Sequence, residues 1–129
     1  MSAQDASEFE IRTLQSEGVV VLAIRGQADL HTVPELGAAF ATVIESGAKQ
    51  LVVDLSETTF IDSMTIGALL GAVKRQKAHQ GRLVVACSVP HVRRVFELTS
   101  LDRVFDLRQS VEEAVAALSE LDPQTEAAR

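Results

Sequence analysis

The sequence contains no tryptophan and no tyrosine, and only five phenylalanines among its 129 residues. A core built from this chain must therefore be mainly aliphatic. Proteins that bind single-stranded nucleic acids stack bases on aromatic side chains, which are scarce here. The 18 acidic residues outnumber the 12 basic ones, and the resulting formal net charge of −6 repels a phosphate backbone. We therefore expect no nucleic-acid partner.

Cysteine is almost absent as well, because Cys87 is the only one in the chain. It lies in the apolar run LVVAC, and it has no second cysteine for an intramolecular disulfide or a cysteine-based metal site. We expect it to be a buried core residue in a reducing compartment, which predicts a cytoplasmic protein. The sequence has no glycine-rich nucleotide loop and no metal-binding motif, so we expect no cofactor.

Long hydrophobic runs are also missing. No uninterrupted apolar stretch approaches the roughly 20 residues that a membrane-spanning helix needs, so we expect no direct membrane insertion. The first ten residues, MSAQDASEFE, lack the basic and apolar segments of a signal peptide. A chain of 129 residues suits one domain. We expect this domain at residues 8–121, with flexible polar termini at 1–7 and 122–129.

Apolar runs typical of strands recur along the chain. The runs at residues 9–14 and 19–24 flank the turn QSEG and predict two paired strands. Further runs lie at residues 51–55, 82–88 and 104–107. The central runs are apolar throughout, which is typical of strands that are buried on both faces of a parallel sheet.

Two helical segments begin with the spacing of a capping box, in which two side chains each bond the other's backbone N–H. Thr32 with Glu35 predicts one helix start, and Ser110 with Glu113 predicts the last one. Gly47 is placed to end the first of these helices. The apolar positions that recur at helical spacing, and that we expect to be buried, are Leu36, Phe40, Val43 and Ile44 in the first and Ala114, Val115, Leu118 and Leu121 in the second.

The other two helices are expected from about residue 64 to 79, ended by Gly81, and from Pro90 onward. The predicted order is therefore β-β-α-β-α-β-α-β-α. Strands that alternate with helices favour a largely parallel sheet covered by helices, and the opening hairpin makes that sheet mixed. The sequence predicts a single α/β domain with a mixed, mostly parallel sheet and about four helices.

Polar residues gather at one predicted strand-to-helix junction, where residues 60–67 read FIDSMTIG. Either Asp62 or Ser63 can cap the following helix by accepting bonds from its free N–H groups, a contribution of about 1 kcal/mol. Asp54, at the end of the preceding apolar run, forms a conceivable carboxylate pair with Asp62. The simpler interpretation is that each carboxylate bonds nearby backbone.

Catalysis at Ser63 would need a general base within hydrogen-bond reach. His79 lies four helical turns away along the same helix and cannot reach it. His31 and His91 lie in predicted loops, and their approach to Ser63 is left open. No GxSxG motif surrounds Ser63. We therefore expect no catalytic residues and no enzymatic activity.

The helix that begins at this junction has an unusual second face. Ile66, Leu69, Leu70 and Val73 form its apolar core stripe. The opposite face carries an exposed methionine and small residues where Glu, Lys and Gln are usual. Small side chains and methionine suit a partner that approaches closely, although cover by the same chain would explain the pattern too. This face collects Met64, Ala68, Gly71, Ala72 and Arg75, with Thr65 at its edge.

A hydroxyl at a helix N-terminus is also a plausible phosphorylation site. Phosphate would add about −1.5 to −2 charges without unfolding the helix, because the helix N-terminus accommodates an anion. If the same surface docks a partner, that charge opposes the contact. A loss of about 3 kcal/mol would weaken binding roughly a hundredfold.

Three segments resemble the STAS domain, which anti-sigma factor antagonists share with the cytoplasmic tails of sulphate transporters. LVVDLSETTFIDSMTIGALLGAVK (residues 51–74) is similar to the family pattern VDLS-x-x-x-F-I/M-D-S-S/T-G-L/I-G-x-L. GQADLHTVPEL (residues 26–36) resembles the family's first loop, and PHVRRVFELTSLDRVF (residues 90–105) resembles its helix-to-strand segment, with Ser100 replacing the usual glycine. The resemblance covers about residues 8–120.

This resemblance implies a cytoplasmic bacterial regulator that binds a serine-kinase anti-sigma factor and so frees a sigma factor. The kinase would phosphorylate the junction to end the complex, and a serine phosphatase would reverse this. Self-association is left open. The expected partner-binding residues are Asp29, carried over from the family's first loop, and Asp62, Ser63, Met64, Thr65, Ala68, Gly71, Ala72 and Arg75.

The sequence departs from the family at the modified residue itself. The hydroxyl that follows the Asp-Ser pair is replaced here by Met64, whose thioether cannot be phosphorylated. Ser63 and Thr65 are the two candidates beside it, and we favour Thr65 slightly because we expect Ser63 to be occupied as a cap. The alternative is a STAS scaffold without a phosphorylation switch, in a signalling assembly or a membrane-transporter complex.

Overall fold

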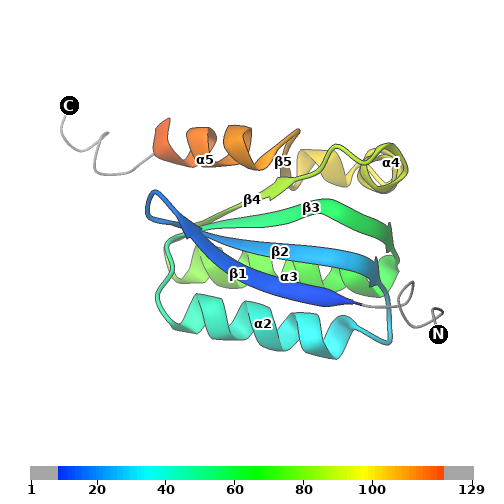
Figure 1. The fold of residues 1–129 in the computed structure, drawn as a ribbon, viewed down its shortest axis with the longest axis horizontal. Coiled ribbons are helices and arrows are strands. Elements are labelled where there is room, and N and C mark those ends of the chain that lie inside the picture. Colours follow the sequence, from blue (N-terminus) through cyan, green and yellow to red (C-terminus); the bar gives the residue numbers. More distant parts are fainter. Residues whose placement is uncertain (1–8, 121–129) are drawn as a thin grey trace.

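The computed structural model describes residues 9–120. Both termini that the sequence predicts to be flexible lie outside these residues. The elements follow the predicted order, which is confirmed (Figure 1). They are β1 (Glu10–Ser16), β2 (Val19–Ala28), α2 (Val33–Glu45), β3 (Gln50–Ile61), α3 (Ser63–Ala78), β4 (Arg82–Ala86), α4 (Pro90–Leu98), the 3-10 helix η1 (Leu101–Arg103), β5 (Asp106–Arg108) and α5 (Val111–Glu120).

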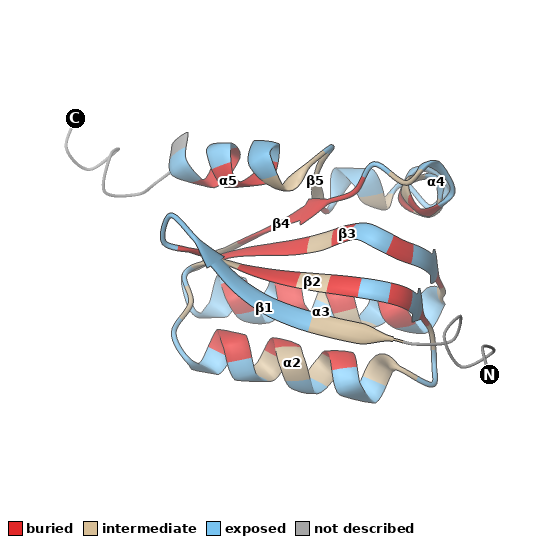
Figure 2. Ribbon diagram, in the orientation of Figure 1, coloured by how far each residue is buried: buried red, intermediate tan, exposed pale blue. Residues whose placement is uncertain are grey.

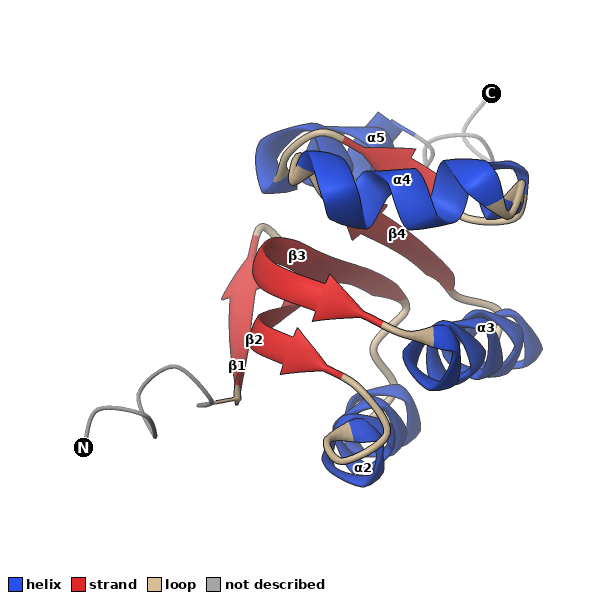
Figure 3. Cartoon of the chain, turned by 90° about the vertical axis from the view of Figure 1, so that its right-hand side faces the viewer, coloured by secondary structure: helices blue, strands red, loops and turns tan. Residues whose placement is uncertain are grey.

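The five strands form one sheet in the order β1-β2-β3-β4-β5. β1 pairs with β2 in antiparallel register, and the remaining three neighbouring pairs are parallel. The mixed, mostly parallel sheet is therefore confirmed. Because β2, β3 and β4 run in parallel, their carboxyl ends meet at one edge of the sheet, where the loops to α2 and α3 begin (Figure 3).

The four α-helices within residues 9–120 lie on both sides of the sheet, which explains why its central strands are apolar throughout. α2 and α3 lie side by side beneath it, and α4 and α5 lie on the other side of β4 (Figure 1). Alternate residues of β3 face opposite sides of the sheet, and each side has its own cluster of core residues. Leu51, Val53 and Leu55 belong to the larger core cluster, together with residues of α2 and α3. Val52 joins a smaller cluster with Leu118 of α5. The buried residues of each helix face inward (Figure 2).

β3 is longer than the sequence predicts, because it continues past Leu55 to Ile61. Its second half stays paired with β2 through two register shifts, until Ala28 lies opposite Ile61. Thr58, only 1% exposed, donates a hydrogen bond from its hydroxyl to the Ile24 carbonyl at 2.7 Å. The extension holds the ends of β2 and β3 together, so the loops that follow them lie close to each other.

The two predicted capping boxes have different outcomes. At α2 the box is absent, because the Thr32 backbone is already helical and its hydroxyl points back into the loop to accept from the Asp29 N–H at 2.9 Å. At α5 the Ser110 hydroxyl accepts from the Glu113 N–H at 3.1 Å, as predicted. The Glu113 carboxylate accepts from Gln109 N–H at 3.1 Å, one residue before the expected partner. Leu121 lies outside the described residues.

The end of α3 shows why a glycine is needed after it. The helix ends at Ala78, and Gln80 takes the left-handed conformation with φ of 64°. The Gly81 N–H then donates to the Gln76 carbonyl at 2.7 Å. A Cβ on Gly81 would lie 2.8 Å from the Lys49 carbonyl oxygen, so any side chain there would displace the backbone.

Candidate functional site

Asp62 is the N-cap of α3 and the central polar residue of the junction. Its backbone is extended, and its carboxylate accepts from the Thr65 N–H at 2.9 Å. The second carboxylate oxygen accepts from the Leu30 N–H at 3.0 Å. Asp62 therefore joins the start of α3 to the loop between β2 and α2. Of the two caps that the sequence left open, the structure selects Asp62.

Asp62 is held in its ionised form. Desolvation opposes ionisation, but hydrogen bonds from Thr65, Leu30 and Met64 outweigh it and lower the Asp62 pKa below its ordinary value. A group whose pKa is lowered by folding stabilises the protein fully above its unfolded pKa. That contribution is lost as the pH falls through the folded pKa. The carboxylate also lies at the positive end of the α3 dipole.

Replacing Asp62 with asparagine should therefore have a pH-dependent effect. At pH 7 we expect Asp62→Asn to lower the free energy of unfolding by up to about 1 kcal/mol, because the amide keeps the shape of the cap but not its charge. As the pH falls through the folded pKa of Asp62 and its carboxyl group becomes protonated, the difference from wild type should shrink. Urea unfolding at pH 7 and at a series of acidic pH values measures it. A difference that stays constant or grows at low pH would show that the charge of Asp62 contributes nothing.

Thr65 is fully buried, and its expected position on the exposed edge of the face is wrong. Its side chain is 0% exposed. The hydroxyl donates to the Ala28 carbonyl at 2.6 Å and lies 3.0 Å from an Asp62 carboxylate oxygen. Ala28 is the last residue of β2, so this bond fixes α3 against the end of the sheet. A phosphate on Thr65 would have no space unless the junction opened.

Ser63 is exposed, and its expected role as the cap is wrong, because Asp62 takes that role. It is the first residue of α3. Among the described residues, its hydroxyl has no hydrogen-bond partner. The exposures of the two candidate hydroxyls are thus the reverse of those that the sequence suggested.

The exposed face of α3 largely matches the predicted one, with one correction. Met64 is 55% exposed, and Gly71 and Arg75 are also exposed. Ala72 is only 2% exposed and belongs to the larger core cluster, so its placement on the docking face is wrong. Gly67 is exposed in its place. Ala68 is half-buried and packs against the same cluster.

The sequence does not single out two exposed apolar side chains beside the junction. Leu30 is 59% exposed and Phe60 is 46% exposed. Leu30 is tied to the junction through its bond to Asp62, and Phe60 lies two residues before Asp62. Asp29, expected at this surface, is half-buried and accepts from the His31 N–H at 3.0 Å. The position of Leu30 and Phe60 near Asp62 becomes apparent only from the extension of β3 to Ile61 and from the bond between the Leu30 N–H and Asp62.

The described residues hold no arrangement for serine catalysis or metal binding. The His91 ring lies 2.6 Å from the Thr59 carbonyl oxygen, and neither it nor His31 bonds Ser63 in the part of the chain that the structure covers. Asp54 bonds the Ser56 N–H at 2.9 Å, which confirms its local role. Within residues 9–120, no three His, Cys, Asp or Glu side chains cluster as metal ligands. Cys87 is buried, as predicted.

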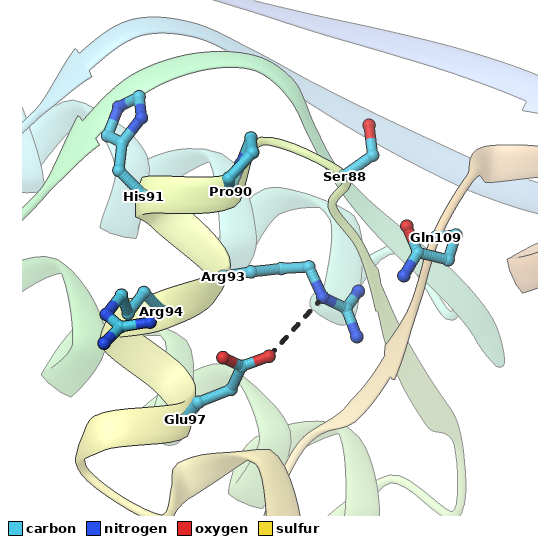
Figure 4. Close-up of a pocket in the computed structure, with 7 residues that line it drawn as sticks. All are labelled: Ser88, Pro90, His91, Arg93, Arg94, Glu97 and Gln109. Carbon is cyan, nitrogen blue, oxygen red and sulfur yellow. Dashed lines mark ion pairs between the residues drawn. The ribbon is translucent and has the colours of Figure 1, made fainter.

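A cavity of about 510 Å³ lies beside the start of α4 (Figure 4). Its lining includes Arg93, whose guanidinium lies 3.9 Å from the Glu97 carboxylate and donates to the Cys87 carbonyl at 2.8 Å. Arg93 therefore fastens α4 to the end of β4. None of the site residues predicted from the sequence lines this cavity.

Among the helices that the structure describes, none has the length and apolar character needed to cross a bilayer.

Comparisons with known proteins agree on one family. The family model of the STAS domain matches residues 10–114. BtrV of Bordetella bronchiseptica, named as an anti-sigma factor antagonist, is 29% identical over 108 residues, which cover 84% of this chain and 93% of BtrV.

Solved structures give the same result. An anti-sigma factor antagonist from Mycobacterium paratuberculosis has a TM-score of 0.82 at 27% identity, covering 88% of this chain and 96% of its own. The Bacillus cell fate determinant SpoIIAA, solved in its phosphorylated form, has a TM-score of 0.64 at 26% identity, covering 86% of this chain and 99% of SpoIIAA.

Proposed function

The chain belongs to the STAS domain family, and we propose that it is an anti-sigma factor antagonist of the bacterial cytoplasm. It binds an anti-sigma factor of the serine-kinase type and thereby releases a sigma factor. The names of its relatives support this function, and so does the exposed apolar surface at the α3 junction. The chain acts by binding rather than catalysis, and ATP belongs to the kinase.

The proposed contact is the junction surface, which combines the exposed face of α3 with the neighbouring loop. Exposed apolar side chains of this size, grouped around one helix start, are typical of a protein-binding site. Gly67 and Gly71 let a partner backbone approach α3 closely, and Met64 adapts to the partner's shape. The junction surface consists of Asp29, Leu30, Phe60, Asp62, Ser63, Met64, Gly67, Ala68, Gly71 and Arg75.

Ser63 is the proposed phosphorylation site within this surface. Its exposed hydroxyl is available to a kinase, whereas the Thr65 hydroxyl is buried against Ala28. A phosphate on Ser63 would stand beside the ionised Asp62 and concentrate negative charge on the docking surface. Desolvating that charge opposes the contact, so phosphorylation releases the partner. SpoIIAA, which is similar in fold, also exists in a phosphorylated form.

A second function follows if Ser63 is not a substrate. Met64 occupies the position at which the family pattern has the modified hydroxyl. A chain that the kinase cannot modify would be a permanent antagonist, or a scaffold in a signalling assembly or a membrane-transporter complex. Self-association or co-purification with a large assembly distinguishes the scaffold.

A pull-down from a lysate of the source cells, with and without Mg-ATP, tests the proposed function. We expect capture of a small kinase-like anti-sigma factor without ATP, and less capture with ATP as the intact mass of the chain rises by one phosphate. If ATP changes neither the amount of anti-sigma factor captured nor the mass of the chain, the protein is an antagonist without a phosphorylation switch. Capture of transport proteins or of a large assembly alone would replace the proposal with the scaffold.

Replacing Ser63 with alanine tests the proposed phosphorylation site. With the captured kinase and Mg-ATP, we expect Ser63→Ala to gain no phosphate and to keep its partner, because the only exposed hydroxyl of the junction is gone. Ser88→Ala removes an exposed serine elsewhere and should be phosphorylated like wild type. Phosphate on the Ser63→Ala variant at Thr65, located by peptide mass spectrometry, would contradict the assignment.

A further inference from the structure

Within residues 9–120, the two sulfur-containing side chains differ sharply in their accessibility. The sequence has two methionines and one cysteine, and Met64 is the only methionine beyond the first residue. Cys87 is 0% exposed, and burial raises the pKa of its thiol. A buried, protonated thiol reacts slowly, because the thiolate is the reactive form. Met64, in contrast, is 55% exposed.

Met64 also belongs to the proposed junction surface, where a change of polarity would oppose docking. It is the second residue of α3, and its backbone contributes to the hydrogen bonds around Asp62. Leu30, whose N–H bonds the same carboxylate, adds an exposed apolar side chain on the loop side. Phe60 adds another on the β3 side. Met64, Leu30 and Phe60 are thus three exposed apolar side chains of the proposed junction surface.

From this geometry we propose that Met64 is an oxidation site at which a peroxide converts the thioether to methionine sulfoxide and weakens docking. The inference rests on the proposed function. In the step, the sulfur attacks the peroxide, the O–O bond breaks and an S=O bond forms. The sulfur loses two electrons, and the second oxygen of hydrogen peroxide leaves as water. Methionine sulfoxide reductases return the side chain to the thioether.

The sulfoxide weakens binding through desolvation. It replaces a flexible apolar group with a polar one, and a polar oxygen covered by an apolar partner surface loses its hydrogen bonds to water. We expect the Kd to rise about tenfold or more. The fold should survive, because the exposed Met64 side chain is not among the buried core residues.

The first part of the test needs no partner. Purified protein is treated with hydrogen peroxide, and peptide mass spectrometry follows oxygen addition at each sulfur. We expect Met64 to gain one oxygen before Cys87 is oxidised, with little change in Tm. Oxidation of Cys87 first, or a Met64 that stays reduced where free methionine is oxidised, would overturn the inference.

The second part measures the Kd for the anti-sigma factor recovered in the pull-down, before and after peroxide. The wild-type Kd should rise about tenfold or more and return after treatment with the reductases MsrA and MsrB. Met64→Leu has no oxidisable thioether at this site, so its ratio of oxidised to untreated Kd should be close to one, whatever its starting affinity.

The outcomes separate the inference from the proposed function. Equal affinity before and after complete oxidation of Met64 would overturn the inference and leave the antagonist function standing. A rise in Kd of the same size in Met64→Leu would place the effect on another group of the chain or on the partner, and would also overturn the inference. Failure of the untreated protein to bind any anti-sigma factor would overturn the proposed function, and the inference with it.

Discussion

Replacing Ala72 with glutamate should unfold the protein, whereas the same replacement at its neighbour Gly71 should not. Ala72 is 2% exposed and packs in the larger core cluster, so a glutamate there would force a carboxylate with no partner into apolar surroundings. We expect a loss of about 4 kcal/mol or more. That is comparable to the whole stability of many domains. Circular dichroism with thermal unfolding measures it.

Gly71→Glu is the matched control. A Cβ built on Gly71 meets nothing within 4 Å, so the side chain extends into solvent. Glutamate also favours a helix over glycine by roughly 0.5 kcal/mol. We expect a Tm equal to or above that of wild type, together with weaker binding to the anti-sigma factor. A folded Ala72→Glu variant, or an unfolded Gly71→Glu variant, would mean that α3 is oriented differently against the sheet.

Replacing Met64 with glutamate should abolish docking without affecting the fold. The side chain is 55% exposed, so a carboxylate there stays solvated in the free protein. In the complex it would be desolvated against the partner. We expect affinity to fall at least about a hundredfold, which corresponds to about 3 kcal/mol. Isothermal titration calorimetry with the recovered anti-sigma factor measures the change.

Ala78→Glu controls for the added charge. Ala78 is exposed at the last residue of α3, roughly 21 Å from Met64 along the helix axis. At physiological salt the Debye length is only about 8 Å, so a charge at this distance is largely screened. The affinity of this variant should stay within about twofold of wild type. Equal losses in Ala78→Glu and Met64→Glu would indicate that net charge, not the junction surface, controls binding.

Much of the fold is predictable from the sequence, because strands buried on two faces and amphipathic helices have strong patterns. The order of elements, the mixed sheet and the burial of Cys87 follow from such patterns. The second half of β3 does not, since SETTFI mixes polar and apolar residues. It forms a strand because β2 supplies hydrogen bonds on one side, and this long-range pairing leaves little trace in local composition.

The misplacement of Thr65 and Ala72 on the exposed face of α3 has one physical cause. Thr65 and Gln76 are polar but fully buried, because each bonds a backbone carbonyl: Thr65 bonds Ala28 and Gln76 bonds Ala48. A hydropathy pattern treats both as exposed and so rotates the inferred core face of α3 away from them. Ala72, which lies on the same buried side, is therefore predicted at the surface. The exposure of Met64 is a local feature and can be predicted, whereas the local pattern leaves the cap open between Asp62 and Ser63.

The central claim is that the partner covers the junction surface, and amide hydrogen exchange tests it most directly. Exchange is followed by mass spectrometry for the full chain alone and in complex with the recovered anti-sigma factor. We predict slower exchange on binding at residues 28–32 and 60–71, with β1 and α5 unchanged. Protection confined to β1 or α5, with the junction exchanging as in the free protein, would contradict the account.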